Sequence, residues 1–259
     1  MINVVHAEPD APTDRRPLLF VHGAWHGAWC WEEYLIPWFV ARGYPCHAVD
    51  LRGHGGSPID GSLRFARIQH YVDDVHTIVD QLTREPVVVA HSMGGLVVQR
   101  LLERIDLPGA VLLAPTPVGG VWRATLRVMR RHPMAFASAN LRWRLWPLVS
   151  SVARAHDLLL APDAPPDEVR RHASRLQDES YLAYLDMLFV TRPRPPLVHT
   201  DVAVIAGDRD RIFSVSELRR TAAAYGAPFH VVEGAAHDLM LDPTWERVAM
   251  LVDEFASTR

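Results

Sequence analysis

The segment PVVVAHSMGG, residues 86–95, joins a short run of β-branched apolar residues directly to the start of a helical pattern. Ser92 stands at the junction, with Ala90 two residues before it and Gly94 two residues after it. A nucleophilic serine on such a sharp strand-to-helix turn needs small residues at these two positions, because larger side chains would clash. The N–H groups at the start of a helix also favour a developing anion. The segment therefore predicts a strand, a nucleophile and a helix, in that order.

The rest of the chain repeats this alternation of short apolar runs and longer helical patterns. Continuous apolar runs bounded by turn residues are typical of a parallel sheet that is covered on both faces. We therefore predict an α/β fold with a doubly wound, mostly parallel sheet of about six strands. The predicted strands cover residues 17–22, 45–50, 86–91, 109–114, 201–206 and 228–233, and the predicted helices cover residues 29–42, 67–83, 93–104, 215–225 and 244–255.

The alternation is interrupted once, between the fourth and the fifth predicted strand. Prolines bracket this stretch on both sides, and its interior holds amphipathic patterns without a further strand of comparable quality. An insertion fits these features better than an ordinary second domain, because the sheet pattern resumes after it. We therefore expect a helical cap at residues 116–196, between a first core part, 1–115, and a second core part, 197–259.

Composition excludes several kinds of chemistry. All 27 basic residues of the 259-residue chain are arginine, and the formal net charge is −3. The lack of lysine excludes Schiff bases, pyridoxal phosphate anchoring and the phosphate loop of NTPases, and the charge argues against nucleic-acid binding. Cys30 and Cys46 are too few for a disulfide framework or a zinc site, so we expect reduced thiols, no metal and a cytoplasmic protein. No secretory leader and no membrane span are expected.

Two further candidate residues follow predicted strands near the end of the chain. Asp210 ends the motif GDRD, and His237 follows the motif GAA. Loops at the carboxyl ends of parallel strands meet at one edge of the sheet. Ser92, Asp210 and His237 are therefore expected to converge as nucleophile, orienting acid and base. Asp208 competes for the role of the acid, and Asp238 is expected only to cap a turn.

The loop after the first predicted strand carries the motif HGAWHGAWCW, residues 22–31. We expect the backbone N–H groups of Ala24, in this loop, and of Met93, after the serine, to form an oxyanion hole. Backbone donors fixed in advance toward an oxyanion need no reorganisation during reaction. Trp25 is expected near the mouth of the pocket, because it lies beside Ala24.

Together these motifs resemble the α/β-hydrolase superfamily. The resemblance covers nearly the whole chain, through HGAWHGAWCW, DLRGHGGS at residues 50–57, AHSMGG, GDRD and GAAHD in the expected order. DLRGHGGS and HSMGG are similar to the lysophospholipase and monoacylglycerol-lipase branch, and HGAWHGAWCW is similar to the plant methylesterase and hydroxynitrile-lyase branch. The resemblance implies a serine esterase or lipase for a small or medium lipophilic ester, without a cofactor. The short N-terminus implies that one or both leading antiparallel strands of the family are missing.

Single residues argue against some of the other activities found in this superfamily. Dehalogenases and epoxide hydrolases use an aspartate where Ser92 stands. The plant lyases use a lysine, which this chain lacks, and a threonine where Gly23 stands. Carbon–carbon bond hydrolases, thioesterases, cofactor-free dioxygenases and receptor-like binding proteins with little turnover stay open as alternatives.

The predicted cap is strongly basic. Residues 107–156 contain seven arginines and no Asp or Glu. Trp122, Trp143 and Trp146 lie in the same stretch and are expected to line the substrate pocket. A basic helix with tryptophans either gathers an anionic or lipid-like ester, or contacts a membrane surface. The simpler alternative, which we favour, is that the arginines are solvated or paired with nearby acids such as Asp178. The sequence does not specify an oligomeric state.

Overall fold

The computed structural model describes residues 1–11 and 13–259. Within these residues the chain forms a seven-stranded sheet with the strand order β1-β3-β2-β4-β5-β6-β7. The edge strand β1 pairs antiparallel with β3, and all the other pairs are parallel. The strands are β1 (Val4–Ala7), β2 (Leu18–Val21), β3 (Cys46–Val49), β4 (Val87–His91), β5 (Gly109–Leu113), β6 (Val202–Gly207) and β7 (Phe229–Val232).

The predicted doubly wound, mostly parallel sheet is confirmed, with one strand more than expected. Every residue of β2, β3, β4 and β5 is buried, which explains why these strands appear in the sequence as continuous apolar runs. The additional strand, β1, lies at the edge of the sheet and is only half buried. It therefore lacks the apolar run by which the others were recognised. One leading antiparallel strand is thus present.

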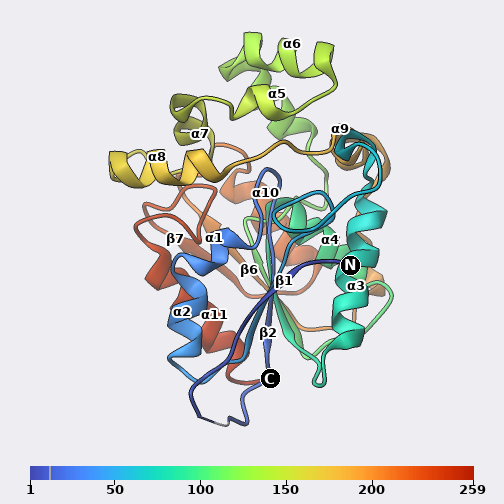
Figure 1. The fold of residues 1–259 in the computed structure, drawn as a ribbon, viewed down its shortest axis with the longest axis vertical. Helices are drawn as coiled ribbons and strands as arrows, with labels where there is room; N and C mark the ends of the chain where they lie inside the picture. Colours follow the sequence, from blue (N-terminus) through green and yellow to red (C-terminus); the bar gives the residue numbers. More distant parts are fainter. Residues whose placement is uncertain (12) are drawn as a thin grey trace.

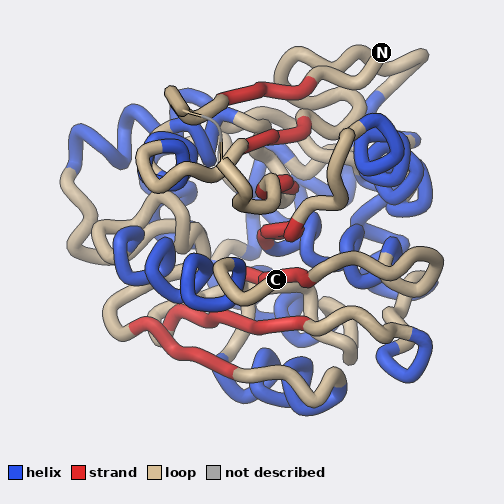
Figure 2. The backbone as a smooth tube through the Cα atoms, turned by 90° about the horizontal axis from the view of Figure 1, so that it is seen from below, coloured by secondary structure: helices blue, strands red, loops and turns tan. Residues whose placement is uncertain are grey.

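Helices cover both faces of the sheet (Figures 1 and 2). The helix α2 (Leu35–Val40) contacts α11 (Trp245–Ala256) on one face, close to the short α1 (Trp29–Glu32). On the other face α3 (Ile68–Gln81) contacts α4 (Ser92–Leu101), and α10 (Val215–Ala224) packs on β6. Both cysteines are buried and free in this core. None of the helices in the described residues has the length and hydropathy needed to cross a bilayer.

The chain between β5 and β6, where every residue is described, forms helices and turns but no strand. These helices lie beyond the carboxyl ends of the parallel strands, at the top of Figure 1. They include the segment predicted as a cap. Its elements are α5 (Trp122–Arg131), α6 (Pro133–Arg142), η2 (Trp146–Leu148), α7 (Val152–Leu159), α8 (Pro166–Arg175), α9 (Tyr181–Leu185), η3 (Asp186–Val190) and η4 (Pro195–Leu197); one short helix, η1 (Leu63–Phe65), precedes α3 in the core.

Candidate active site

Three side chains at the carboxyl edge of the sheet form one hydrogen-bonded chain. Ser92 begins α4 directly after β4, Asp210 follows β6, and His237 follows β7. The Nε2 atom of His237 lies 2.9 Å from Ser92 Oγ, and its Nδ1 atom lies 2.9 Å from Asp210 Oδ2. All three side chains are almost completely buried. The structure therefore brings together the three residues that the sequence singled out.

The backbone at Ser92 is strained in the way that a sharp strand-to-helix turn requires. Its φ angle is 50°, in the left-handed region that non-glycine residues rarely adopt. Two residues later, a Cβ atom on Gly94 would lie only 2.4 Å from the carbonyl oxygen of His22 and 2.6 Å from that of Val21. The absence of a side chain at Gly94 therefore lets the start of α4 rest against the end of β2, which keeps the serine raised at the edge of the sheet.

The second carboxylate oxygen of Asp210 fixes the acid in place. Oδ1 accepts hydrogen bonds from the N–H groups of Ile212, at 2.7 Å, and of Phe213, at 2.9 Å. Asp208, the competing acid, instead accepts a bond from the N–H of Gly234, and its side chain is 34% exposed. The geometry thus selects Asp210 as the partner of His237.

The two residues predicted to supply the oxyanion donors line the same cavity as the serine. Ala24 and Met93 line this cavity together with Ser92. The N–H of Met93 lies in the first turn of α4, where helical N–H groups have no partner within the helix. A carbonyl oxygen bonded to Ser92 would develop its negative charge between such donors.

His22 holds the peptide unit that carries the Ala24 N–H. Its Nδ1 atom donates to the carbonyl oxygen of Gly23, at 2.8 Å, and its Nε2 atom accepts from the N–H of Leu51, at 3.1 Å. This pair of bonds requires a neutral ring with the proton on Nδ1. Burial, aided by the neighbouring His54, lowers the pKa of His22 well below its usual value and so maintains that form.

The cavity beside Ser92 has a volume of about 90 Å³ and mostly apolar walls. The cap helices contribute Ala124, Val128 and Phe136 from α5 and α6, and Tyr184 from α9. Ser92, Ala24, Met93 and an apolar chamber under the helices between β5 and β6 thus form a single site.

The model of the alpha/beta hydrolase family matches residues 18–250, which is most of the chain. This protein belongs to the alpha/beta hydrolase family. Among curated relatives, pheophorbidase of Raphanus sativus is 39% identical over 79 residues, covering 30% of this chain and 29% of that protein. Methylesterase 3 of Arabidopsis thaliana is 32% identical over 131 residues, covering 49% of this chain and 46% of that protein. The matched regions therefore span less than half the length of these relatives.

Solved structures of other proteins share the fold of this alpha/beta hydrolase. BpoC of Mycobacterium tuberculosis superposes with a TM-score of 0.79 at 19% identity, covering 100% of this chain and 96% of that one. A monoacylglycerol lipase of Paleococcus ferrophilus gives a TM-score of 0.71 at 20% identity, covering 99% and 100% of the two chains. At such identities the likeness concerns the fold alone.

Of the four tryptophans predicted to line the pocket of this alpha/beta hydrolase, the structure places only Trp25 there. Trp122 and Trp143 are 48% and 51% exposed, and Trp146 is partly buried against the hydrophobic core without lining the cavity. The prediction for these three residues is wrong: α5 places its small residue Ala124 at the cavity and leaves Trp122 exposed, and Trp143 and Trp146 follow the end of α6 outside the cavity lining.

The seven arginines of the predicted basic stretch, residues 107–156, all of which are described, also do not line the cavity. Arg127 pairs with Glu217 at 2.6 Å, Arg131 pairs with Asp157, and Arg144 pairs with Asp178 at 2.6 Å. The simpler interpretation, that the arginines are solvated or paired with nearby acids, therefore accounts for these three residues.

A second histidine–carboxylate pair behind His237 was not foreseen. Asp238 Oδ2 accepts from His26 Nε2 at 3.1 Å, and His26 Nδ1 donates to the carbonyl oxygen of Ala24 at 2.8 Å. His91 Nε2 donates to the carbonyl oxygen of His237 at 3.0 Å. The expectation that Asp238 only caps a turn is therefore wrong. No sequence signal connects these residues, since His26 and Asp238 lie 212 positions apart.

These interior groups also resemble a metal site. Atoms of His91, His237 and Asp238 that could bind a metal lie within 4.8 Å of one another. Both ring nitrogens of His237 already face Ser92 and Asp210, however, and His91 Nε2 faces a carbonyl oxygen. The hydrogen bonds of the site thus account for these three nitrogens, whereas His91 Nδ1 and Asp238 Oδ1 have no hydrogen-bond partner among the described residues.

The environment of His237 sets its proton affinity. Burial lowers the pKa of the ring, but the carboxylate of Asp210, with smaller contributions from Asp238 and Asp242, raises it by more, so the pKa lies above its usual value. In the neutral ring, Nδ1–H donates to Asp210 and leaves Nε2 free to accept the proton of Ser92.

Replacing Asp210 should separate the two candidate acids. We expect Asp210→Asn to lower kcat on an activated ester by about 10⁴, because an amide at this position favours the wrong histidine tautomer. Asp208→Asn, the matched control in the same loop, should change kcat only slightly. Steady-state kinetics of the two purified variants provide the measurement, and a larger loss in the Asp208 variant would transfer the role to that residue.

The pH dependence of kcat/KM should show the raised pKa of His237. Because the protonated ring cannot accept the serine proton, activity should be lost as the pH falls through this pKa, with a midpoint above the ordinary value of about 6.5. Asp210→Asn should move the midpoint to lower pH, since it removes the main group that raises the pKa. A profile that is flat between pH 5 and pH 8 would contradict the assignment of histidine as the base.

Proposed function

We propose that this alpha/beta hydrolase cleaves the carboxylic ester of a small or medium lipophilic substrate through an acyl-enzyme on Ser92. The observation that carries the proposal is the buried chain Asp210–His237–Ser92, whose serine faces an apolar cavity. The relatives named as esterases support hydrolysis in general. The Ser-His-Asp geometry supports acyl transfer in particular.

The proposed reaction proceeds in two stages. Ser92 Oγ attacks the ester carbonyl carbon while His237 Nε2 takes the serine proton, and the N–H groups of Ala24 and Met93 stabilise the oxyanion. The intermediate collapses as the bond to the alcohol oxygen breaks and His237 returns the proton to that oxygen. Water then attacks the acyl-enzyme with His237 as base, which releases the carboxylic acid and restores Ser92. These residues need no cofactor for either stage.

The cavity favours an uncharged, apolar group on the substrate. Two of its polar side chains already have partners: Asn140 accepts from Tyr181, and Tyr184 donates to Thr125. The indole N–H of Trp25 has none among the described residues. A polar substrate group placed there would lose its bonds to water and could gain a bond from this donor, but its charge would have no opposite charge among the lining side chains. The apolar walls thus favour a lipophilic neutral ester over an anionic one.

The nucleophile is tested by Ser92→Ala. We expect kcat to fall by a factor on the order of 10⁶, with an unchanged melting temperature. The substrates are p-nitrophenyl esters of increasing acyl length and an anionic hemisuccinate ester. A thioester and a vinylogous diketone test the two alternative reactions, thioester hydrolysis and carbon–carbon bond hydrolysis. A wild-type protein that cleaves none of the esters, or a variant that retains ester turnover, would contradict the proposal.

The size of the cavity is tested by Ala124→Phe. Ala124 is buried in the cavity wall, so the added ring should occupy space needed by the acyl chain. We expect kcat/KM for medium-chain esters to fall by about tenfold or more, which corresponds to the cost of about 1–3 kcal/mol for overpacking a filled site. The kcat/KM for the acetate ester should fall less. Trp122→Ala on the same helix is the matched control and should leave both values unchanged. Equal losses on all chain lengths would place the acyl group elsewhere.

A further inference from the structure

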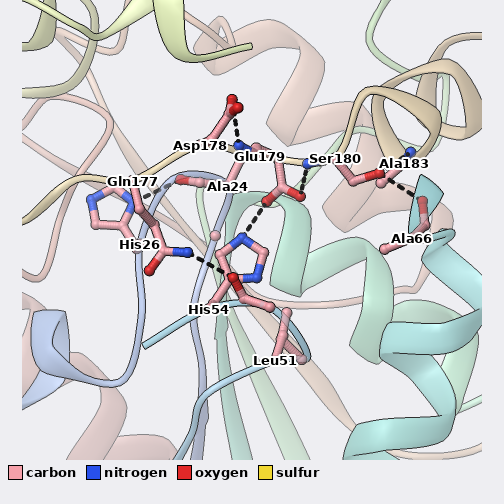
Figure 3. A network of polar contacts seen from close by, with 12 residues as sticks. Ala24, His26, Leu51, His54, Ala66, Gln177, Asp178, Glu179, Ser180 and Ala183 are labelled. Carbon is pink, nitrogen blue, oxygen red and sulfur yellow. Dashed lines mark hydrogen bonds and ion pairs between the residues drawn. The ribbon is translucent and has the colours of Figure 1, made fainter. Parts of the chain in front are cut away.

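A short connection in the cap reaches down to the core beside the oxyanion loop. We call residues 177–180, between α8 and α9, the strap (Figure 3). Figure 3 shows the strap crossing above the loop that follows β3, with the side chains of Gln177 and Glu179 pointing into it. The strap is therefore a place where the cap and the core are joined by polar contacts.

Gln177 bonds to two different loops of the core. Its side-chain amide donates to the carbonyl oxygen of Gly53 and accepts from the N–H of Gly55, both at 2.9 Å. Its backbone N–H donates to the carbonyl oxygen of Trp25, also at 2.9 Å. One residue of the cap thus fixes the loop after β3 and the loop after β2 at the same time.

The bond to Trp25 bears on the oxyanion hole because Trp25 directly follows Ala24. Trp25 has a φ angle of 68°, a left-handed conformation that needs support from its surroundings. The carbonyl oxygen of Ala24 is held by His26, and that of Trp25 is held by Gln177. Together with the bond from His22 to Gly23, three successive carbonyl groups around the Ala24 N–H are held in place, and the third depends on the cap.

Glu179 anchors the strap in the interior. Its carboxylate lies 3.1 Å from His54 Nε2 and accepts from the hydroxyl of Tyr71 at 2.8 Å, and it also accepts from the N–H of Ser180. His54 and Glu179 are fully buried. The other ring nitrogen of His54 faces the carbonyl oxygen of Arg52, so both nitrogens face acceptors, an arrangement that favours the protonated ring.

The strap continues directly into a wall of the cavity. The hydroxyl of Ser180 donates to the carbonyl oxygen of Ala66 in the core and accepts from the N–H of Ala183 in the first turn of α9. Tyr184 of α9 and Met187, just beyond it, line the cavity. Seating the strap on the core therefore places both the oxyanion loop and this wall.

We propose that Gln177 and Glu179 are positioning residues for the reaction at Ser92: the buried pair Glu179–His54 seats the strap, and Gln177 then holds the loop that carries the Ala24 N–H. The cap thereby contributes to stabilisation of the oxyanion as well as to the pocket. The proposal rests on the proposed ester hydrolysis. A displacement of about 1 Å at a reacting group is enough to slow an enzyme about a hundredfold. Residues that fix the position of the Ala24 N–H can therefore affect the rate without touching the substrate.

The direct test is Gln177→Ala, which removes the two side-chain bonds and loosens the strap. We expect kcat to fall by about tenfold or more with a nearly constant KM, because the lost interaction acts on the transition state. The affinity for a trifluoromethyl ketone, which forms an oxyanion on Ser92, should fall by the same factor. Asp167→Asn, which breaks the exposed pair with Arg170 on α8, is the matched control and should change neither value.

Rates are divided by the fraction of Ser92 that a fluorophosphonate titrates, so that loss of folded protein is not counted as loss of kcat. An unchanged kcat per titrated serine, with or without a lower melting temperature, would overturn the proposal and leave the strap a structural element. Wild-type turnover in the same assay separates this result from a failure of the proposed function, in which the wild type itself would not cleave esters.

A second variant, Glu179→Gln, tests the anchor by its pH dependence and covers the case in which Gln177→Ala does not fold. Burial lowers the pKa of His54, but Glu179 raises it by more, so the net pKa lies above the usual value. The other ionisable groups facing the ring are His22, Tyr71 and Asp50. The charged pair is therefore complete below the ordinary histidine pKa of about 6.5 and is lost as the pH rises through the raised pKa of His54.

In the wild type we expect kcat/KM to decline as the pH rises through the raised pKa of His54 and the ring loses its proton. Glu179→Gln removes the group that raises this pKa, so the decline should move to lower pH. The acid limb, which belongs to His237, should stay in place because Glu179 does not contact that residue. Identical alkaline limbs in the two proteins would overturn the role of the pair.

Discussion

The close contact between the end of β2 and the start of α4 is the constraint on which the site depends. Without a side chain at Gly94, the first turn of α4 rests against the carbonyl groups of Val21 and His22. This contact holds Ser92 in a left-handed conformation and brings the loop after β2 beside it. Ser92 and the loop proposed to supply an oxyanion donor are thus placed by one backbone contact, and His237 and Asp210 reach the same point from the ends of β7 and β6.

The sequence was sufficient to predict the candidate site residues wherever their placement depends on local geometry. A small–x–Ser–x–Gly turn between a strand and a helix, and acid and base at the ends of later strands, identify Ser92, Asp210 and His237 because each motif lies within a few residues of its strand. The parallel sheet was equally visible, since central strands are buried on both faces. The edge strand β1 escaped notice because half of its surface faces solvent.

The features of the site that could not be predicted from the sequence depend on contacts between distant segments. Whether a tryptophan of the cap faces the cavity depends on how α5 lies on the core, and no local pattern records that orientation. His54 and Glu179 are 125 positions apart, and Gln177 meets Gly53 across a similar separation. In its own segment, His54 is an ordinary loop histidine, and Gln177 and Glu179 are ordinary polar residues of a linker. They contact one another's loops only when the cap lies on the sheet.

The direct pairing of β5 with β6 has a further consequence for how such a protein can change over evolution. The two strands are neighbours in the sheet, although the whole helical segment lies between Leu113 and Val202 in the chain. A longer segment between the two strands costs little additional free energy of loop closure, about 0.6 kcal/mol for each doubling of its length. The core therefore tolerates helices being lengthened, shortened or exchanged above it. Substrate preference can diverge through such exchanges while the chemistry at the sheet edge is retained, provided that each new segment still meets the core beside the oxyanion loop.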